Sequence, residues 1–296
     1  MRITQATTAD LMLQGVDASY GAFETTSAQI ASGLAITKPS DNPAGAVQVM
    51  SYDADITRLG QYQANANDAV AWLGSAQNTL GSVSSQLQKV QSLVQQAANG
   101  TTDAAGRAAI ADQIDTIRSS LLADANTTYQ GRPIFGGTTG GTHAYDSSGN
   151  YIGDSGTVNR TLAAGTSVQV NVLGTDAFGS GSASIFAVLT QVSSDLRSSN
   201  PTNINAIGTT DLTAVQQSFT TLQTVQATVG SRYNEVQSLQ AGAQSRQTTL
   251  ITAKSTVSDL DLAKAETELA TQQLTYQAAL QATARVLSLS LSEFLK

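Results

Sequence analysis

The chain has 296 residues, and charged residues make up only 12% of it, against roughly 25% in an average soluble domain. Its formal charge is −7 and its 15 Lys and Arg residues are scattered without a basic stripe, so we expect no nucleic-acid partner. No window approaches the roughly 20 apolar residues that a membrane span needs, and a count of zero cysteines excludes disulfides and thiolate chemistry.

The amino-terminal region repeats small or apolar residues at alternating spacings of three and four, which is the pattern of a coiled-coil helix. The repeat begins at Ala6, ends at Leu34 and is followed by Pro39 and Pro43. Asn42 and Pro43 are typical of an N-cap and a first helical residue, so a second, long helix is predicted from Pro43 to about Asn99. Asp103 is the expected cap of a shorter third helix that ends near Asn126.

The region 131–182 changes character, because glycines become frequent and the helical repeat disappears. Val168, Val170 and Val172 alternate as in a half-exposed strand. The run from Tyr145 to Tyr151 contains Gly149 and Asn150 and predicts a turn between two short strands. We therefore expect a small β-rich insert here.

The helical pattern returns from Ile185 to Leu196, and a long repeat then runs from Leu212 to Val257. Continuing it would bring Asp261, Lys264 and Glu268 into the apolar seam, so the helix must break near Ser258. A new phase starts at Leu262, slips by four residues after Tyr276 and ends near Phe294. This slip predicts a stutter in the last helix.

The predicted fold is mainly α, with long coiled-coil-like helices, paired N- and C-terminal helices and a small β-rich central insert. Three domains are expected: residues 1–42 with 258–296, residues 43–130 with 183–257, and residues 131–182. One narrow seam buries little apolar area against an ordering cost of about 1 to 2 kcal/mol per residue. The terminal pair is therefore expected to be mobile in the monomer and to become ordered when many copies assemble. The alternative is that both ends belong to an ordinary helical bundle.

Twelve apolar side chains of the two terminal helices are the expected assembly interface: Leu13, Val16, Tyr20, Phe23, Ile30, Leu34, Leu262, Leu269, Tyr276, Leu280, Leu287 and Phe294.

The sequence offers little for catalysis. Its single histidine, His143, lies in a Gly- and Thr-rich run, so neither a catalytic triad nor a two-histidine metal site can be built from it. The paired carboxylates, such as Asp53 with Asp55, are two residues apart and point away from each other on a helix. We expect no enzyme activity, no cofactor and no metal.

Several motifs together resemble the bacterial flagellin superfamily and, within it, the hook-associated protein 3 family. They are the opening Met1-Arg2-Ile3-Thr4, the run Pro39-Ser40-Asp41-Asn42-Pro43, the run from Asn126 to Gly137, and the tail from Asp259 to Phe294. The Gly131-Arg132-Pro133-Ile134-Phe135-Gly136-Gly137 part favours the junction protein over flagellin itself.

This resemblance implies a structural subunit of the bacterial flagellum, an adaptor at the hook–filament junction that forms a ring of copies. It also implies contacts with hook-associated protein 1, with flagellin and with a flagellar export chaperone. The protein would be secreted by type III export without a cleaved signal peptide. Two alternatives stay open: a flagellin, that is, a filament subunit, and an adhesin that uses the β-rich insert for binding.

Overall fold

The computed structural model of the protein describes residues 5–99 and 102–294, and the side chains of 5, 6, 9 and 287–294 are outside the description. The predicted mainly α fold is confirmed, since long helices hold most of these residues and the strands form two small antiparallel sheets. Contacts divide the chain into two compact units. The terminal unit comprises Met1–Arg58 and Arg246–Lys296, and the central unit comprises Leu59–Ser245.

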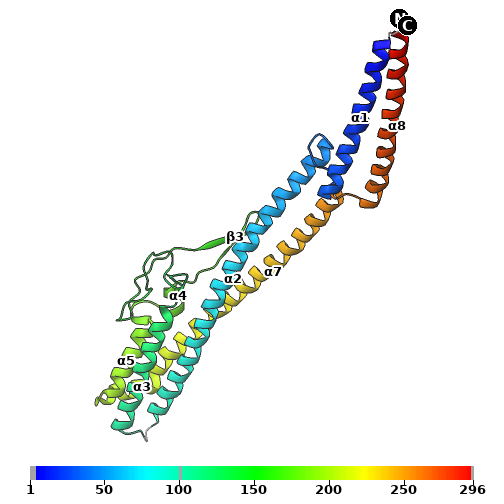
Figure 1. The fold of residues 1–296 in the computed structure, drawn as a ribbon. Coiled ribbons are helices and arrows are strands. Elements are labelled where there is room, and N and C mark those ends of the chain that lie inside the picture. Colours follow the sequence, from blue (N-terminus) through cyan, green and yellow to red (C-terminus); the bar gives the residue numbers. More distant parts are fainter. Residues whose placement is uncertain (1–4, 100–101, 295–296) are drawn as a thin grey trace. The chain divides into compact units, whose positions relative to one another are not determined.

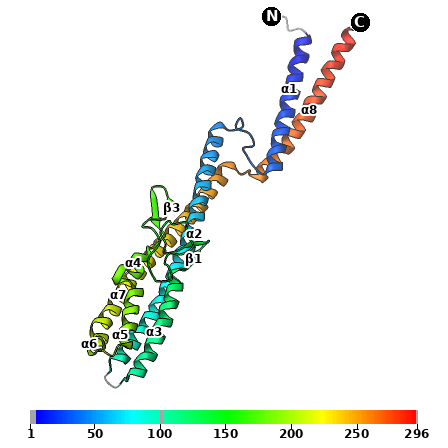
Figure 2. The same cartoon turned by 90° about the vertical axis from the view of Figure 1, so that its left-hand side faces the viewer.

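In the terminal unit, helix α1 (Gln5–Ser32) lies antiparallel to helix α8 (Leu262–Phe294), as the blue and red ribbons in Figures 1 and 2 show. The unit also holds the first part of α2 (Pro43–Ala98) and the last part of α7 (Leu212–Ser258). Lys254 on α7 forms a salt bridge of 2.6 Å with Asp53 on α2. The predicted break near Ser258 is confirmed because α7 ends there.

In the central unit, α2 and α7 pack with α3 (Ala104–Ala125) and α5 (Ile185–Arg197) around one apolar core. The core side chains recur along α2 from Ala66 to Ala97, and they meet α7 residues from Val215 to Val236. Capping fixes the helix ends as predicted: the Asn42 side chain accepts a hydrogen bond from the Gly45 N–H at 3.0 Å, and Asp103 accepts one from the Gly106 N–H at 2.7 Å.

The insert holds two short hairpins and is otherwise mostly irregular. The hairpin of β1 (Thr128–Tyr129) and β2 (Arg132–Pro133) turns through Gln130 and Gly131, both at positive φ (51° and 78°), as a type I′ turn requires. The second hairpin pairs β3 (Asn159–Ala163) with β4 (Thr166–Gln169). The insert also contains helix α4 (Gly174–Phe178) and the 3₁₀ turn η1 (Gly181–Ala183).

An aromatic cluster forms the core of the insert. Tyr145 makes edge contacts with Phe186 and Tyr151, at ring-centroid distances of 5.0 and 5.3 Å, and Phe135 packs on Phe178 at 5.1 Å. The predicted turn from Tyr145 to Tyr151 is confirmed by a bridge between these two residues.

The structure departs from the expectations at the bounds of several elements. Helix α1 ends at Ser32 rather than Leu34. Between the predicted helical segments 185–196 and 212–257, a short helix α6 (Pro201–Ala206) and a π-helical segment η2 (Ile207–Asp211) precede α7, and neither was expected. Strand pairing in the insert begins at Thr128, and β4 ends at Gln169 rather than continuing to Val172. The three-domain division itself stays a prediction.

Candidate assembly surface

The candidate assembly surface is the outside of the terminal unit. The pairing of α1 with α8 determines which side chains this surface exposes. The least exposed residues on each helix alternate in spacing between four and three, as in a coiled-coil seam. Tyr20 and Tyr276 contact each other across the pair with ring centroids 5.6 Å apart. The partly or fully buried seam residues are Met12, Val16, Ser19, Phe23, Thr26 and Ile30 on α1, and Ala265, Leu269, Gln272, Tyr276, Ala279 and Thr283 on α8.

The seam is narrow and partly polar. Thr26 and Thr283 are buried within it, at 5% and 7% exposure, and the Oε1 atom of Gln272 is buried without a hydrogen-bond partner among the described residues. A polar atom without a partner costs about 1 to 3 kcal/mol on burial. The pair therefore gains less from its contact than an all-apolar seam of the same length would.

Five of the predicted interface residues lie half-buried in this seam: Val16, Phe23, Ile30, Leu269 and Tyr276. Five others are more exposed, namely Leu13 at 49%, Tyr20 at 50%, Leu34 at 39%, Leu262 at 52% and Leu280 at 43%. The side chains of Leu287 and Phe294 are outside those that the structure describes. A role of all twelve in assembly stays a prediction.

The predicted four-residue slip is not seen in the α1–α8 pair. The three-four spacing of the buried side continues past Tyr276 through Ala279 and Thr283, and Leu280 lies beside the seam. Small side chains at these two positions allow the helices to stay paired without a change of phase. Leu280 is therefore available on the outside of the pair.

Large exposed apolar side chains gather in the terminal unit. Ten of the eleven in the described part of the chain belong to it, and Ile152 alone belongs to the central unit. Besides the five just given, they are Leu11, Val47, Met50, Ile251 and Leu274. Only two buried apolar residues of the described chain lie in the terminal unit, and both are alanines, Ala46 and Ala265. The unit thus presents apolar side chains outward and buries almost none.

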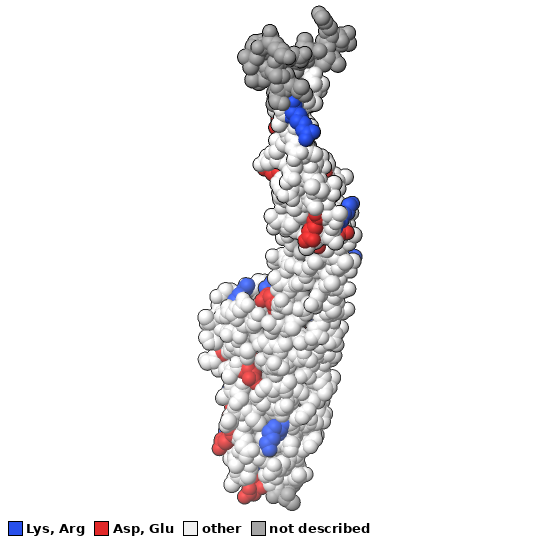
Figure 3. All heavy atoms as spheres, turned by 45° about the vertical axis from the view of Figure 1, so that its right-hand side comes forward, with Lys and Arg blue, Asp and Glu red and all other residues white. Residues whose placement is uncertain are grey.

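Charge does not oppose close packing of this surface. On the face shown in Figure 3, blue and red atoms are sparse and most exposed atoms belong to uncharged residues, in agreement with the composition of the chain. The terminal unit itself has 8 Lys and Arg residues against 11 Asp and Glu residues, so its net charge is small and repulsion between copies is weak.

A backbone clasp joins the segments that follow α1 and precede α8. Leu34 and Asp259 form an isolated antiparallel bridge. The Ala35 N–H donates to the Ser258 carbonyl at 2.8 Å and the Leu260 N–H donates to the Gly33 carbonyl at 3.0 Å. This clasp fixes the end of α1 relative to the start of α8. Sequence reasoning did not find it, because no local pattern marks a bridge between residues so far apart.

The Pro39–Pro43 motif also has a structural role. The Asp41 carboxylate accepts hydrogen bonds from the Thr37 and Lys38 N–H groups, at 3.0 and 2.8 Å, and from the Thr37 hydroxyl at 2.8 Å. The Thr37 hydroxyl bond and then the Lys38 N–H bond lower the pKa of Asp41. The motif closes the loop that leads into α2.

The motif from Asn126 to Gly137 anchors the insert in the central unit. The Asn126 side-chain oxygen accepts hydrogen bonds from the Ala144 and Tyr145 N–H groups at 2.8 and 2.9 Å, and its amide donates to the Tyr145 carbonyl at 3.0 Å. Further along, Thr138 donates from its N–H and its hydroxyl to Asp154, at 2.6 and 2.9 Å. These residues hold irregular backbone in place and offer no reactive group.

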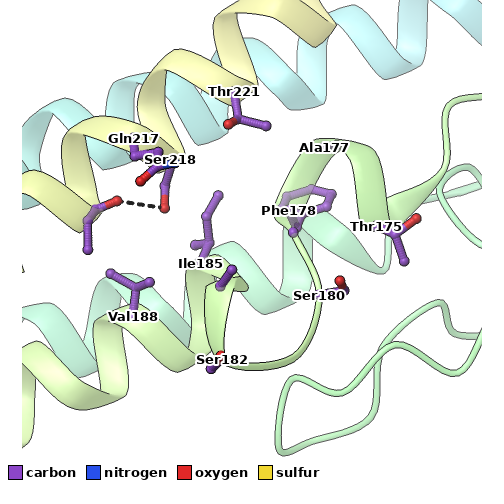
Figure 4. A pocket seen from close by; sticks show the side chains of 13 residues that line it. Thr175, Ala177, Phe178, Ser180, Ser182, Ile185, Val188, Gln217, Ser218 and Thr221 are labelled. Carbon is purple, nitrogen blue, oxygen red and sulfur yellow. Dashed lines mark hydrogen bonds between the residues drawn. The ribbon is translucent and has the colours of Figure 1, made fainter.

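The central unit also contains a hollow. It has a volume of about 390 Å³ and lies between the α4–η1 region and α7, with Thr175, Phe178 and Ser218 among its lining residues (Figure 4). None of the residues that line it is ionisable, so it supplies neither an acid nor a base. His143 lies exposed in its loop, where the Thr142 hydroxyl is 2.8 Å from its Nδ1 atom.

No helix within residues 5–99 and 102–294 combines the length and the apolar character that crossing a membrane requires. No group of three or more His, Cys, Asp or Glu side chains in that same part of the chain is arranged to hold a metal ion.

Comparison with known families accounts for this architecture. The family model of the bacterial flagellin N-terminal helical region matches residues 3–139, and that of the C-terminal helical region matches residues 212–295. The chain belongs to the bacterial flagellin family. Its resemblance to hook-associated protein 3 is also confirmed: it is 26% identical to the flagellar hook-associated protein 3 of Escherichia coli K12 over 96% of each chain.

Matches to filament subunits are shorter. A flagellin of Clostridium tyrobutyricum is 30% identical over 100 residues, which are 34% of this chain and 26% of that protein. Among solved structures, the flagellar junction protein FlgL of Legionella pneumophila has the same fold, with a TM-score of 0.59 at 14% identity, and the match covers 73% of this chain and 100% of that one.

Proposed function

We propose that this protein is a structural subunit of the bacterial flagellum that acts as an adaptor at the hook–filament junction. Its central unit is a preformed body, and its terminal helices become ordered when several copies assemble. The observation that carries this proposal is the concentration of large exposed apolar side chains in the terminal unit. Such a surface on a protein of this kind marks contacts with other chains.

The relatives favour the adaptor over the filament subunit. Similarity to a hook-associated protein 3 runs over 96% of both chains, whereas the flagellin cited above matches about a third of this chain. Flagellin remains the second candidate, because that shorter match reaches 30% identity. Self-assembly separates the two: an adaptor should not grow long filaments from purified protein, and a filament subunit should.

The adaptor proposal includes specific partners. Copies of this chain would form a ring. Hook-associated protein 1 would lie on one side of the ring and flagellin on the other. A flagellar export chaperone would bind the last helix before secretion by type III export, without a cleaved signal peptide. We infer no enzymatic activity, since the described residues assemble hydrogen-bonded loops and a neutral hollow rather than a reactive site.

Deletion of the gene tests the role directly. The expected result is cells that keep their hooks, lose their filaments and release flagellin monomer into the medium. Hooks that carry normal filaments after the deletion would refute the adaptor role. Electron microscopy of the cells and immunoblotting of the medium give both readouts.

A matched pair of variants in the complementing gene tests the surface. Leu274→Gln changes an apolar side chain that is 68% exposed in the terminal unit, and Ile152→Gln changes one that is 55% exposed in the central unit. Both should leave the monomer folded. In cells that lack the chromosomal gene, we expect Ile152→Gln to restore the wild-type number of filaments per cell and Leu274→Gln to give fewer filaments. Equal effects of the two variants would count against the terminal unit as the assembly surface.

A further inference from the structure

Two acidic side chains are buried together at the corner where α5 meets η2. Asp195 on α5 and Asp211 at the end of η2 are each only 4% exposed, and the two elements are in contact. Asp195 accepts a hydrogen bond from the Gln191 amide at 2.9 Å. The Oδ2 atom of Asp211 is buried and has no hydrogen-bond partner in the part of the chain that the structure describes.

The cationic side chains of the neighbouring elements bind other groups than this pair. Arg197, on α5, instead donates to Asp112 and Asp115 of α3, both at 2.7 Å. On α3, Arg107 donates to the Thr102 carbonyl at 3.0 Å and Arg118 to the Ser148 carbonyl at 3.1 Å.

The other elements at this corner add little charge. Helix α6 contains no ionisable residue, and the first charged residue of α7 is Arg232. The end of α2 reaches η2, because a Cβ placed at Gly208 would lie 3.2 Å from the Ala98 Cβ. In the last part of α2, from Lys89 to Ala98, the one charged side chain is that of Lys89, which is exposed to solvent. Two negative charges in this corner would therefore stay uncompensated.

Burying a carboxylate without a cation is unfavourable, so such a group takes up a proton instead. Burial first, and the charge of Asp195 second, raise the pKa of Asp211 to about 6. The corner is built on a π-helical segment, a rare conformation that frequently accompanies functional sites. The short helix α6 and the π-helical segment η2 should open more easily than the long helices around them.

We propose that the α5–η2 corner is a joint that is more stable at acid pH. Protonated Asp211 is held beside Asp195 in it, and ionisation of Asp211 loosens residues 201–211. The sign follows from linkage: the folded corner holds the proton more tightly than the open, hydrated corner does. The closed state is therefore favoured most below about pH 4, loses stability as the pH rises from about 4 to 6, and stays at its lower stability above that. This device is independent of the proposed assembly role.

Hydrogen exchange of the full-length protein tests the joint. After correction for the intrinsic rate, protection of the amides in residues 201–212 should fall at least about tenfold between pH 4.5 and pH 7, since each pKa unit corresponds to a factor of ten. In Asp211→Asn, which keeps a neutral side chain of the same shape, protection should not depend on pH. The control Asp176→Asn, at an exposed position on α4, should behave like the wild type.

A wild-type corner whose protection is the same at both pH values would overturn the proposal, as would an Asp211→Asn variant that keeps the wild-type dependence. Carboxyl ¹³C NMR gives a second measurement that does not need this variant. Asp211 should titrate with a midpoint near 6, and Asp195→Asn should move the midpoint to lower pH. A wild-type midpoint near 4 would also contradict the proposal.

Discussion

The central and terminal units use the same kind of helix in opposite ways. In the central unit, Leu73, Leu80 and Leu87 on α2 are at most 1% exposed, because α3, α5 and α7 contribute to one core around them. In the terminal unit, α1 pairs mainly with α8, and leucines such as Leu11 and Leu274 are 60% and 68% exposed. The number of neighbouring helices, rather than helix length, decides whether a helical repeat is buried.

The energetic consequence is unequal stability. Complete burial of a leucine contributes about 1.5 to 3 kcal/mol, and partial burial contributes proportionately less. Ordering each residue costs about 1 to 2 kcal/mol in both units. In the central unit, apolar burial within one chain offsets that cost, whereas the terminal unit depends on contacts with other chains.

The largest expected effect contrasts two leucines. Leu80→Ala removes a side chain that is 0% exposed in the central core, and Leu274→Ala removes one that is 68% exposed on α8. The first should lower the free energy of unfolding by about 2 to 5 kcal/mol because it leaves a cavity. The second should change it by less than about 0.5 kcal/mol. Guanidinium titration of the monomer gives both values, and similar losses would contradict the contrast between the units.

A smaller effect is expected at two glycines of the insert, both of which have positive φ. A Cβ at Gly137 (φ 75°) would lie 2.1 Å from the Asp154 Oδ1 and 2.4 Å from the Asp154 carbonyl, whereas at Gly165 (φ 72°) nothing lies within 4 Å. Both changes to alanine cost the left-handed strain of about 1 to 2 kcal/mol. Gly137→Ala should cost at least about 1 kcal/mol more, since backbone must move.

Thermal and denaturant unfolding of the two glycine variants measure this difference. Equal destabilisation would show that the Gly137–Asp154 approach adds nothing to the stability of the central unit, and that the insert is held in another way.

A third contrast concerns the anchor of the insert. Asn126→Ala removes three hydrogen bonds to the backbone of Ala144 and Tyr145 and should cost about 2 kcal/mol, because partly buried N–H groups lose their partner. Asn159→Ala, at an exposed position in β3, is the control and should be nearly neutral. Faster hydrogen exchange at Ala144 and Tyr145 in the first variant alone would locate the loss, and an unchanged rate would contradict it.

Much of the fold could be predicted from local signals. Proline and capping residues mark helix starts by short-range chemistry, so the starts at Pro43 and after Asp103 were found. Each of these signals acts on residues only a few positions away from it. The break at Ser258 was found from the repeat itself, because continuing it would bring charged residues into the apolar seam.

Helix α6 was missed although its signal is local: Asn200 caps it, accepting a hydrogen bond from the Thr202 N–H at 3.0 Å, and Pro201 is its first residue. The polar run before it was interpreted as a break only, and nothing in the sequence indicated the π-helical turn of η2.

Features that depend on distant residues were missed. The clasp between Leu34 and Asp259 and the burial of Asp195 with Asp211 bring together segments that no periodic pattern connects. Leu280 matches the repeat but lies outside the seam, because small residues let the earlier phase continue.

The central claim is that the terminal unit lacks enough neighbours within one molecule, and hydrogen exchange on dilute monomer and on assembled copies tests it most directly. In the monomer, amides of α1 and α8 should exchange far faster than those of α3, α5 and the core part of α2, and assembly should slow their exchange strongly. Terminal helices as well protected in the dilute monomer as the central core would contradict the account.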